Sequence, residues 1–502
     1  SSRTRGAAMS TIAEAAPPAA ARAPAGPSIV DEVRAAVERA RLAQVAWGAL
    51  PVRERVRRMR ALRGLLVRRM EDVIAVVREE TGKPAVEALG HEVMIVAGLI
   101  KAYEKRAPRV LRAKRVGTGI LVNKGGTKSY EPFGVVGVIS PWNFPFSMPG
   151  IPAVAALFAG NAVVIKPSEV TPRTGAMLAE LAREAIPDHP ELVQVVQGRG
   201  DAGAALVRSG VAKIAFIGSP ATGRKILTGA AETLTPVVME LGANDVSIVC
   251  EDADLDRAAA GVVWGAMSNA GQVCMSVERA LVPDRIYDRF AAAVQREMES
   301  LRVGEGDDID VGRLIFPPQR AIIQHTVDDA VAHGGRVVLG GRVASETGPV
   351  YAPTLILDAT EEMALSCSET FGPVLPLVRV KDEDEAVRMA NAGPYGLNAS
   401  VWTRSRAKGR RIAGRLQAGM VMINDVLINF GIPELPYGGV KQSGFGRMMG
   451  DEGLLEFSQV KAVADTRVAL KRELFWFPYR PKQLAMLKRL TRFAYGTRRG
   501  PT

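Results

Sequence analysis

Short β-rich runs alternate with helical stretches through the middle of the chain, and this alternation constrains the fold more than any single motif. The runs span residues 135–140, 162–165, 192–196, 213–217 and 246–249, and helical stretches such as 174–185 and 223–231 separate them. Strands joined through helices pair in parallel, because a parallel crossover needs about a dozen residues or more. The sequence therefore predicts an α/β fold with a parallel sheet, and a second alternating region, 255–402, continues the pattern.

The length and composition predict a globular chain with more than one domain. The chain has 502 residues, of which 47% are hydrophobic and 24% charged, enough for two or more cores. Residues 31–106 show helical periodicity ahead of the first strand. Residues 1–28 are rich in Ala and Pro and contain no apolar run of signal-peptide length, so we predict a disordered leader. We find no apolar span of about twenty residues and expect a cytoplasmic protein.

The cysteine and histidine content narrows the chemistry. Three cysteines, Cys250, Cys274 and Cys367, lie in different contexts, which indicates reduced thiols and no disulfide framework. The four histidines are not paired with one another or with cysteines at metal-ligand spacing. This argues against a zinc site and against a Ser/His hydrolase, so we expect no metal.

A thiol and a carboxylate form the first candidate catalytic pair. Cys274 closes the run NAGQVC, thirty-four positions after Glu240 in the run MELG. A thiolate can attack a carbonyl and hold the product as a thioester, and a carboxylate can activate the water that releases it. A single cysteine is more often a small buried apolar residue, so Cys274 alone is a weak signal.

Loops that follow the predicted strands supply candidate ligand-binding groups. Parallel sheets bind ligands at the carboxyl ends of their strands, next to helix N-termini. Gly218 and Ser219 stand at such a helix start and suit a pyrophosphate, and we expect the chain to lack an ordinary Rossmann G-x-G-x-x-G fingerprint. Taken singly, Gly218 could be a turn, Ser219 a helix N-cap and Lys166 a surface charge.

Seven runs in the expected order resemble the NAD(P)-dependent aldehyde dehydrogenase superfamily, of the hydrolytic, non-acylating type. They are PWNFP (141–145), GNAVVIKPSE (160–169), FIGSPATG (216–223), MELG (239–242), GQVC (271–274), ETFGPVLP (369–376) and PYGGVKQSGFGR (436–447). The resemblance covers residues 31–468. It implies an aldehyde dehydrogenase-like α/β fold, with a Rossmann-like cofactor domain, an α/β catalytic domain and a small bridging β-element.

The resemblance implies a role for each of three residues. Cys274 would attack the aldehyde carbon, and the side-chain amide of Asn143 with the backbone N–H of Cys274 would stabilise the oxyanion. Glu240 would deprotonate the water that hydrolyses the thioester. Family members that pass the acyl group to coenzyme A lack this glutamate, so Glu240 favours the hydrolytic reaction.

The resemblance also implies a nicotinamide cofactor site. It places Lys166 and Glu169 at the adenosine ribose and Trp142 beside the adenosine half. Gly218 and Ser219 would contact the pyrophosphate, and Glu369 and Phe371 the nicotinamide riboside. A carboxylate at Glu169 accepts both ribose hydroxyls and repels a 2′-phosphate, which favours NAD; Lys166 could compensate, so NADP stays open.

Domain boundaries follow from the same resemblance. Residues 29–114 and 131–241 would form the NAD-binding domain and 242–440 the catalytic domain. Residues 115–130 and 456–468 would form an oligomerisation β-element, because a β-arm that leaves its own domain exposes unpaired edges. A homodimer or a homotetramer is therefore expected.

Apolar residues near the expected tunnel favour a medium- or long-chain or aromatic aldehyde. They are Phe144, Phe146, Met148, Ile151 and Met275, and all of them could equally be core residues. Succinate semialdehyde stays an alternative substrate, and a non-catalytic binding scaffold is the alternative from another class. Cys250 and Cys367 are expected in the core or in a wall, and Ala243 stands where the family has a second glycine.

The segment 471–502 lies outside the resemblance and carries most of the net charge. It has nine basic residues and one acid, which gives +8 of the formal +12 of the chain. Its opening is aromatic, and Met486, Leu487, Leu490 and Phe493 can share a helical face opposite its basic residues. We predict peripheral binding to an anionic membrane surface, at its inner face, and no nucleic acid. The alternative is that the same face packs on a neighbouring subunit or covers the substrate funnel.

Overall fold

The computed structural model describes residues 28–343 and 349–496. Nearly all of the predicted leader, residues 1–28, lies outside the described residues; Ser28, its last residue, caps the first helix by accepting a hydrogen bond from the backbone N–H of Asp31. The predicted helical region forms a layer of helices against the first sheet: α1 (Ile29–Ala49), α2 (Val52–Arg68), α3 (Met70–Thr81), α4 (Ala85–Glu87), a π-helical turn (Ala88–Val93) and α5 (Met94–Val110).

The first sheet contains the predicted parallel strands. Its order is β15-β7-β6-β3-β4-β5, parallel except for β15, which is antiparallel to β7. The strands are β3 (Val135–Ile139), β4 (Ala162–Lys166), β5 (Val193–Val195), β6 (Lys213–Ile217), β7 (Val237–Glu240) and β15 (Gly444–Phe445). The helices that follow them are α6 (Ser147–Ala159), α7 (Pro172–Ala185), α8 (Gly200–Val207) and α9 (Pro220–Ala231). Helices on both faces bury β3, β4 and β6 completely, as their continuous apolar runs require.

A second, seven-stranded sheet holds the rest of the α/β pattern, in the order β10-β11-β12-β9-β8-β13-β14. Only the β10–β11 pair is antiparallel. The strands are β8 (Asp245–Val249), β9 (Val277–Pro283), β10 (Arg336–Leu339), β11 (Thr354–Ala359), β12 (Val374–Val380), β13 (Asn398–Trp402) and β14 (Met420–Ile423). The helices are α10 (Leu255–Met267), α11 (Asp284–Glu299), α12 (Gln319–Ala332), α13 (Ala364–Cys367), α14 (Glu383–Ala392) and α15 (Arg406–Ala413), with 3₁₀ turns at Ser268–Gly271, Ile428–Gly431 and Lys441–Ser443. The helix before β16, α16 (Gly450–Glu456), packs instead on α5 and α6 beside the first sheet.

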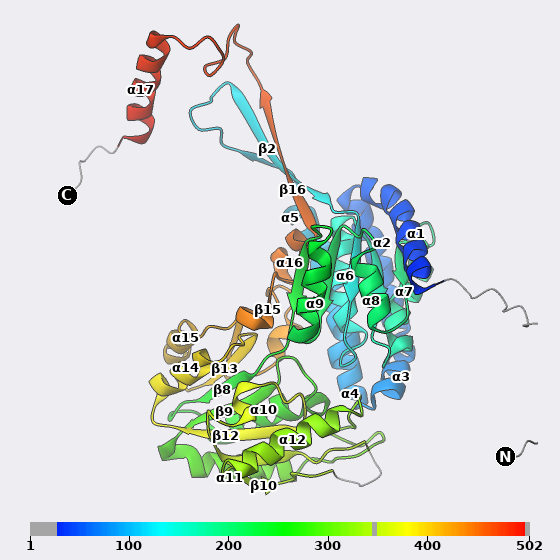
Figure 1. The fold of residues 1–502 in the computed structure, drawn as a ribbon, viewed down its shortest axis with the longest axis vertical. Coiled ribbons are helices and arrows are strands. Elements are labelled where there is room, and N and C mark those ends of the chain that lie inside the picture. Colours follow the sequence, from blue (N-terminus) through cyan, green and yellow to red (C-terminus); the bar gives the residue numbers. More distant parts are fainter. Residues whose placement is uncertain (1–27, 344–348, 497–502) are drawn as a thin grey trace, which may run out of the picture.

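A three-stranded antiparallel arm leaves the body of the molecule. It consists of β1 (Lys114–Val116), β2 (Lys124–Pro132) and β16 (Ser458–Thr466), and β2 lies between the other two. Figure 1 shows the arm at one end of the molecule, with α17 (Pro481–Tyr495) at its tip. The arm overlaps the predicted oligomerisation element, whose exact boundaries, like those of the other domains, stay a prediction.

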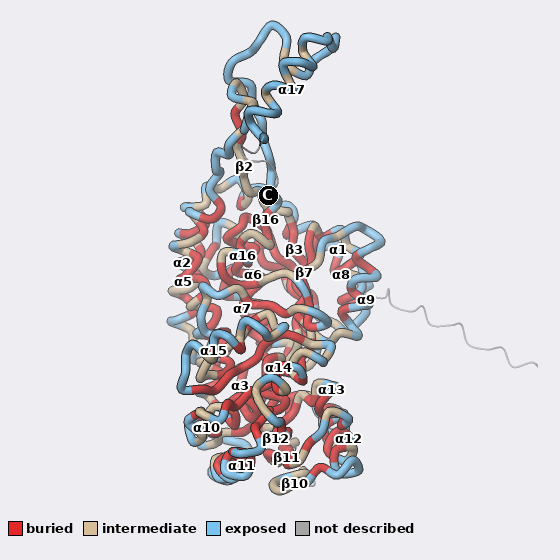
Figure 2. The backbone as a smooth tube through the Cα atoms, turned by 90° about the vertical axis from the view of Figure 1, so that its left-hand side faces the viewer, coloured by how far each residue is buried: buried red, intermediate tan, exposed pale blue. Residues whose placement is uncertain are grey.

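Burial follows this division of the molecule. Figure 2 shows the buried chain within the two sheets and the helices around them, whereas the arm and α17 are largely exposed. Within the described ranges, no helix has both the length and the apolarity that a membrane crossing requires.

Candidate active site

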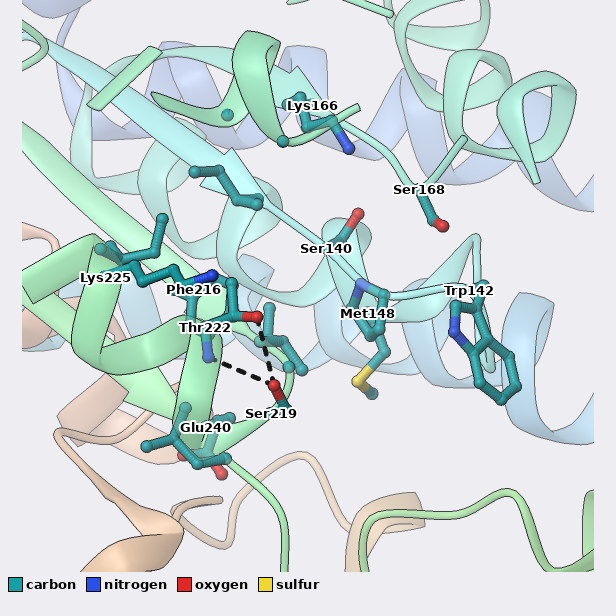
Figure 3. Close-up of a pocket in the computed structure, with 18 of the residues that line it drawn as sticks. Ser140, Trp142, Met148, Lys166, Ser168, Phe216, Ser219, Thr222, Lys225 and Glu240 are labelled. Carbon is teal, nitrogen blue, oxygen red and sulfur yellow. Dashed lines mark hydrogen bonds between the residues drawn. The ribbon is translucent and has the colours of Figure 1, made fainter. Parts of the chain in front are cut away.

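A cavity of about 790 Å³ opens at the carboxyl ends of β3, β4, β6 and β7. All ten residues predicted for the catalytic and cofactor sites line it: Trp142, Asn143, Lys166, Glu169, Gly218, Ser219, Glu240, Cys274, Glu369 and Phe371. Figure 3 shows part of this lining, with Glu240, Ser219 and Lys166 on neighbouring strand ends. The cavity thus brings together residues that are up to 229 positions apart, from Trp142, after β3 of the first sheet, to Phe371, before β12 of the second sheet.

Cys274 follows a strained turn at the end of α10. The three residues Asn269, Ala270 and Gly271 all have positive φ, of 51°, 55° and 71°. Left-handed backbone costs energy outside glycine, and surrounding contacts must hold it in place. Here the Glu87 carboxylate accepts from Asn269 N at 2.9 Å, and Asn269 Nδ2 donates to Gln272 O at 3.1 Å. The turn therefore fixes the direction in which Cys274 leaves the helix.

The Cys274 thiol is enclosed by protein but reaches the cavity. Burial raises its pKa to about 12, and the nearby Glu240 and Glu369 carboxyl groups act in the same direction. One side chain opposes this effect: the Tyr437 hydroxyl lies 3.1 Å from Cys274 Sγ. The thiol therefore needs hydrogen-bond donors, or a bound cofactor, to ionise near neutral pH.

Glu240 ends β7 with its carboxyl group inside the protein. Both carboxyl oxygens are buried and have no hydrogen-bond partner among the described residues. Burial raises the pKa of Glu240 well above its usual range, and Arg447 only partly opposes this. Gly438, at φ +155°, makes room for the group, because a Cβ there would lie 2.7 Å from Glu240 Oε1. An unpaired buried carboxyl group aimed at a cavity is suited to exchange a proton with bound water.

Asn143 is held by a buried network that was not predicted. Its Nδ2 donates to Gln272 O at 3.1 Å, and its backbone oxygen accepts from Lys83 Nζ at 2.9 Å and from Asn269 Nδ2 at 3.1 Å. Lys83 Nζ also binds Glu92 Oε1 at 2.8 Å, and both side chains are almost fully buried. The network ties the Asn143 loop to the turn that precedes Cys274.

Glu92 also caps the helix that follows Asn143. Its Oε2 accepts from Phe146 N at 3.1 Å and from Ser147 N at 2.8 Å, at the start of α6. These are amides that the helix itself leaves unpaired. Lys83 and Glu92 lie in helical, charged sequence that reads as a solvated surface, so only the tertiary structure reveals the pair.

The predicted ribose and pyrophosphate residues lie at the carboxyl ends of β4 and β6, and β3 lies between these two strands. Lys166 ends β4, and its Nζ lies 3.4 Å from Glu169 Oε2, with Lys166 buried and Glu169 half exposed. Ser219 is the N-cap of α9, since its Oγ accepts from Thr222 N at 3.3 Å (Figure 3). The N-cap and ligand-binding interpretations of Ser219 are therefore compatible, because the capped helix N-terminus faces the cavity.

Trp142, Glu369 and Phe371 meet in the middle of the cavity wall. The Trp142 and Phe371 rings lie edge to face, 5.4 Å apart. Glu369 Oε1 accepts from Ala243 N at 3.2 Å, and burial raises the pKa of Glu369 to about 8. Ala243 has no positive φ, so an alanine fits where a glycine was expected. Trp142 thus contacts Phe371, which is predicted to lie at the nicotinamide riboside. The predicted place of Trp142 beside the adenosine half of the cofactor stays a prediction.

A glycine-rich turn that sequence reasoning missed lines the same cavity. Residues 198–203 read GRGDAG, which matches the G-x-G-x-x-G pattern, and they join β5 to α8. Gly198 has φ +135°, and a Cβ there would lie 2.7 Å from that of Ala202. Arg199, Gly200 and Gly203 line the cavity at this end. The pattern alone could have revealed this turn, since it follows a predicted strand.

The lining fits a dinucleotide. It offers a carboxylate for ribose hydroxyls at Glu169, a helix N-terminus for a pyrophosphate at Ser219, and apolar side chains between α8 and α9 at Val207 and Ile226.

A second, apolar cavity of about 310 Å³ lies on the other side of Cys274. Phe144, Met148 and Met275 line it, as predicted, whereas Phe146 and Ile151 are not in its wall and are buried core residues. Phe146 is the N-cap residue of α6, and it packs in the core. Cys274 and Met148 border both cavities.

The other two cysteines lie outside both cavities. Cys250 is buried directly after β8, as expected. Cys367 is exposed, so its prediction as a core or wall residue is wrong: it ends the short α13, where Sγ donates to Glu361 O.

One group of possible metal ligands occurs among the described residues: Cys250, Asp252 and Glu383. Lys408 Nζ lies 3.0 Å from both of its carboxylates, so an ammonium group already supplies the positive charge.

Comparison with known proteins identifies the family. The aldehyde dehydrogenase family model matches residues 16–463. A 4,4′-diapolycopene aldehyde oxidase of Methylomonas sp. is 41% identical over 461 residues, 91% of this chain and 86% of that protein. A putative NADP(+) succinate-semialdehyde dehydrogenase of Mycobacterium ulcerans is 37% identical, over 87% of this chain and 85% of that protein.

Solved structures agree with the sequence comparison. The crystal structure of an NAD-dependent aldehyde dehydrogenase from Sinorhizobium meliloti superposes with a TM-score of 0.84 at 37% identity, over 89% of each chain. The predicted resemblance and the predicted α/β fold class are thereby confirmed. The chain belongs to the aldehyde dehydrogenase family.

Proposed function

We propose that this protein oxidises an apolar aldehyde to the carboxylic acid with a nicotinamide cofactor, through a thioester on Cys274. The position of Cys274 carries the proposal: it borders a cavity that fits a dinucleotide and, on its other side, an apolar cavity. A nucleophile in that position can reach a carbonyl held in the second cavity while a nicotinamide ring lies in the first.

Each step has a group in place. The Cys274 thiolate attacks the carbonyl carbon, and Asn143 Nδ2 with the Cys274 backbone N–H donates to the oxyanion. The bound nicotinamide supplies the acceptor for the hydride that the carbon loses. Glu240 then takes a proton from water, which attacks the thioester and frees Cys274. The unpaired, buried carboxyl oxygens of Glu240 support this role, and their presence beside Cys274 argues against a non-catalytic scaffold.

Removal of the nucleophile tests the proposal directly. Cys274→Ala should abolish NADH formation from any aldehyde, because no other group can form the thioester. Cys250→Ala and Cys367→Ala are matched controls outside both cavities, and should keep most of the activity. Substantial turnover by Cys274→Ala would refute the mechanism.

The proposed base is tested by timing. Glu240→Gln should transfer one hydride per site and then stop, because attack and hydride loss need only Cys274. Mass spectrometry should then find an acyl group on Cys274. Fast steady-state turnover by Glu240→Gln, or an absent acyl adduct, would exclude Glu240 as the deacylating base.

For the cofactor we propose NAD in preference to NADP. Glu169 lies at the end of the cavity where a ribose 2′-hydroxyl would bind, although Lys166 beside it can offset its charge. The named relatives include both an NADP(+) enzyme and an NAD-dependent one. Glu169→Gln should lower the KM for NADP and raise that for NAD, and an unchanged NAD/NADP ratio would refute the assignment.

The apolar cavity supports a medium- or long-chain or aromatic aldehyde. Its wall contains Phe144, Trp264 and Phe430 and, in the described part of the chain, no Lys or Arg. Burial lowers the pKa of His91 in this wall to about 4, so His91 is neutral near pH 7. Succinate semialdehyde, the alternative, brings a carboxylate that would find no cationic partner in this cavity.

A panel of aldehydes distinguishes the two substrates. We expect kcat/KM to rise with chain length and aromaticity and to be low for succinate semialdehyde. The relative named as a 4,4′-diapolycopene aldehyde oxidase supports long apolar substrates. A preference for succinate semialdehyde over an uncharged aldehyde of equal length would contradict the assignment.

The arm supports assembly into a dimer or tetramer. The β16 strand pairs with β2 along one edge, and eight of its nine residues are exposed. Among the described strands, the other edge of β16 is open, and an open strand edge of this length is a template with which another chain can pair. Sedimentation velocity should therefore find an oligomer, and a monomer at micromolar concentration would refute this.

The segment after the arm supports peripheral binding to an anionic membrane. α17 forms as expected and has no buried residue, and the aromatic residues before it are exposed: Phe475, Trp476, Phe477 and Tyr479. Glu473, the single acid of this segment, pairs with Lys124 of the arm at 2.8 Å, so the basic residues stay uncompensated within the tail. Exposed aromatic groups beside a basic amphipathic helix favour the interface of an anionic bilayer.

Liposome sedimentation tests this proposal. The full chain should bind vesicles with anionic lipid, less so at high salt, and deletion of residues 471–502 should abolish binding without changing the oligomer. If the full chain does not bind vesicles, or if the deletion breaks the oligomer, the segment packs on protein instead.

A further inference from the structure

Tyr437 is the side chain that meets the Cys274 sulfur. Its hydroxyl lies 3.1 Å from Cys274 Sγ, and the residue is only 3% exposed. It belongs to the loop between the turns Ile428–Gly431 and Lys441–Ser443, directly before Gly438. Gly438 makes room for Glu240, so this loop contacts both proposed catalytic groups.

Packing of the Tyr437 ring holds its hydroxyl group in position. The Tyr437 and Phe430 rings pack edge to face at 5.3 Å, and both line the apolar cavity. Tyr437 O accepts from Met448 N at 3.0 Å, which fixes the backbone. Among the described residues, the Tyr437 hydroxyl makes one hydrogen bond, and its partner is the Cys274 sulfur.

The groups around Tyr437 and Cys274 favour the Tyr437 hydroxyl as the donor of their hydrogen bond. Burial raises the pKa of Tyr437 well above 10, so it keeps its proton. The groups that act on Cys274 from other elements are the Glu240, Glu369 and Asp245 carboxyls, which all disfavour a thiolate. His91, in the wall of the apolar cavity, is neutral, because burial lowers its pKa to about 4.

We propose that Tyr437 is a catalytic residue that donates its O–H to the Cys274 thiolate and so makes the nucleophile available at lower pH. This rests on the proposed role of Cys274. The thiol proton leaves to water in the cavity, and Tyr437 keeps its own proton throughout. When the sulfur forms its bond to the carbonyl carbon, it loses its negative charge and the hydrogen bond weakens. The donor therefore lowers the reactivity of each thiolate, but the larger thiolate population outweighs this loss near neutral pH.

Tyr437→Phe removes one oxygen and keeps the ring. We would measure alkylation of Cys274 by iodoacetamide against pH, without cofactor or aldehyde, in a Cys250→Ala/Cys367→Ala background. A hydrogen bond to a charged group is worth enough to change the thiolate population about tenfold, or about one pH unit. Alkylation near neutral pH should therefore fall by up to about tenfold in Tyr437→Phe, because its curve lies at higher pH.

Tyr351→Phe is the matched control. It also removes a buried tyrosine hydroxyl, one that donates to Gln324 Oε1 and lies outside both cavities, so its alkylation curve should not move. Coincident curves for Tyr437→Phe and the parent, or an equal fall in Tyr351→Phe, would overturn the proposal. Activity in Cys274→Ala would sink the proposed function instead, whereas the alkylation curve reports on the thiol alone.

Discussion

Loss of the Lys83 ammonium group should damage both stability and catalysis. Lys83 Nζ lies 2.8 Å from Glu92 Oε1 and 2.9 Å from Asn143 O, and the side chain is 1% exposed. Lys83→Met keeps most of the side-chain volume but leaves the Glu92 carboxylate buried with only the Phe146 and Ser147 amides as donors. Lys83→Met thus removes the positive charge of a buried ion pair and one hydrogen-bond donor to the backbone of the Asn143 loop.

The size of the effect follows from this geometry. Breaking a buried ion pair by removing one partner costs about 3–5 kcal/mol, which is about 10 °C in melting temperature for a cooperative unit of about 200 residues. A shift of about 1 Å in a positioning group costs about 100-fold in rate. Since Asn143 supplies the proposed oxyanion donor, we expect kcat to fall between about 10- and 100-fold.

The assay combines thermal unfolding with steady-state kinetics in a double-mutant cycle. Lys83→Met and Glu92→Gln should each destabilise the protein, but the double variant should lose less than the sum, because the neutral amide needs no cation. Lys461→Met, which removes an exposed pair with Glu131, is the control and should cost under about 1 kcal/mol. Additive losses, or a Lys83→Met protein with wild-type melting and kcat, would refute the reasoning.

Two further predictions concern the proposed catalytic groups. Burial raises the pKa of Cys274 to about 12, so its thiolate is a minor form near neutrality and increases with pH; burial also raises the pKa of Glu240, which acts in the same direction. The kcat/KM measured in buffers of constant ionic strength should therefore rise from about pH 7 to about pH 9, and a flat profile would contradict it. Gly438→Ala places a Cβ 2.7 Å from Glu240 Oε1 at a positive φ, so it should slow deacylation at least about tenfold while the first hydride transfer persists. Stopped-flow absorbance separates these phases, and an equal loss in both would disprove the assignment.

Local sequence was enough to predict the strands and the residues at their ends. Each apolar run between 135 and 249 became a parallel strand, because both faces of the sheets are covered by helices. Once strands are parallel, loops at their carboxyl ends must meet, which explains why Asn143, Lys166 and Ser219 share one cavity with Cys274.

Contacts between distant charged or aromatic residues could not be predicted in this way. The Lys83–Glu92 pair lies in helical sequence where charges usually face solvent, but here Lys83 binds the Asn143 backbone and Glu92 binds the amides at the start of α6, inside the protein. Similarly, the ring of Tyr437 gives no local sign that its hydroxyl meets a sulfur 163 positions earlier. Phe146 and Ile151 were expected near the substrate tunnel but lie in the core, because apolarity alone does not distinguish a residue of a cavity wall from a core residue.

The pairing within the arm sets the order in which the chain can be completed. Lys124 of β2 pairs with Thr466 of β16, 342 positions later. On a ribosome, β2 can pair with β1 early but must wait for β16 until both α/β units have been synthesised. The proposed subunit association through this arm would therefore be a late event, open only to chains whose last strand has been made.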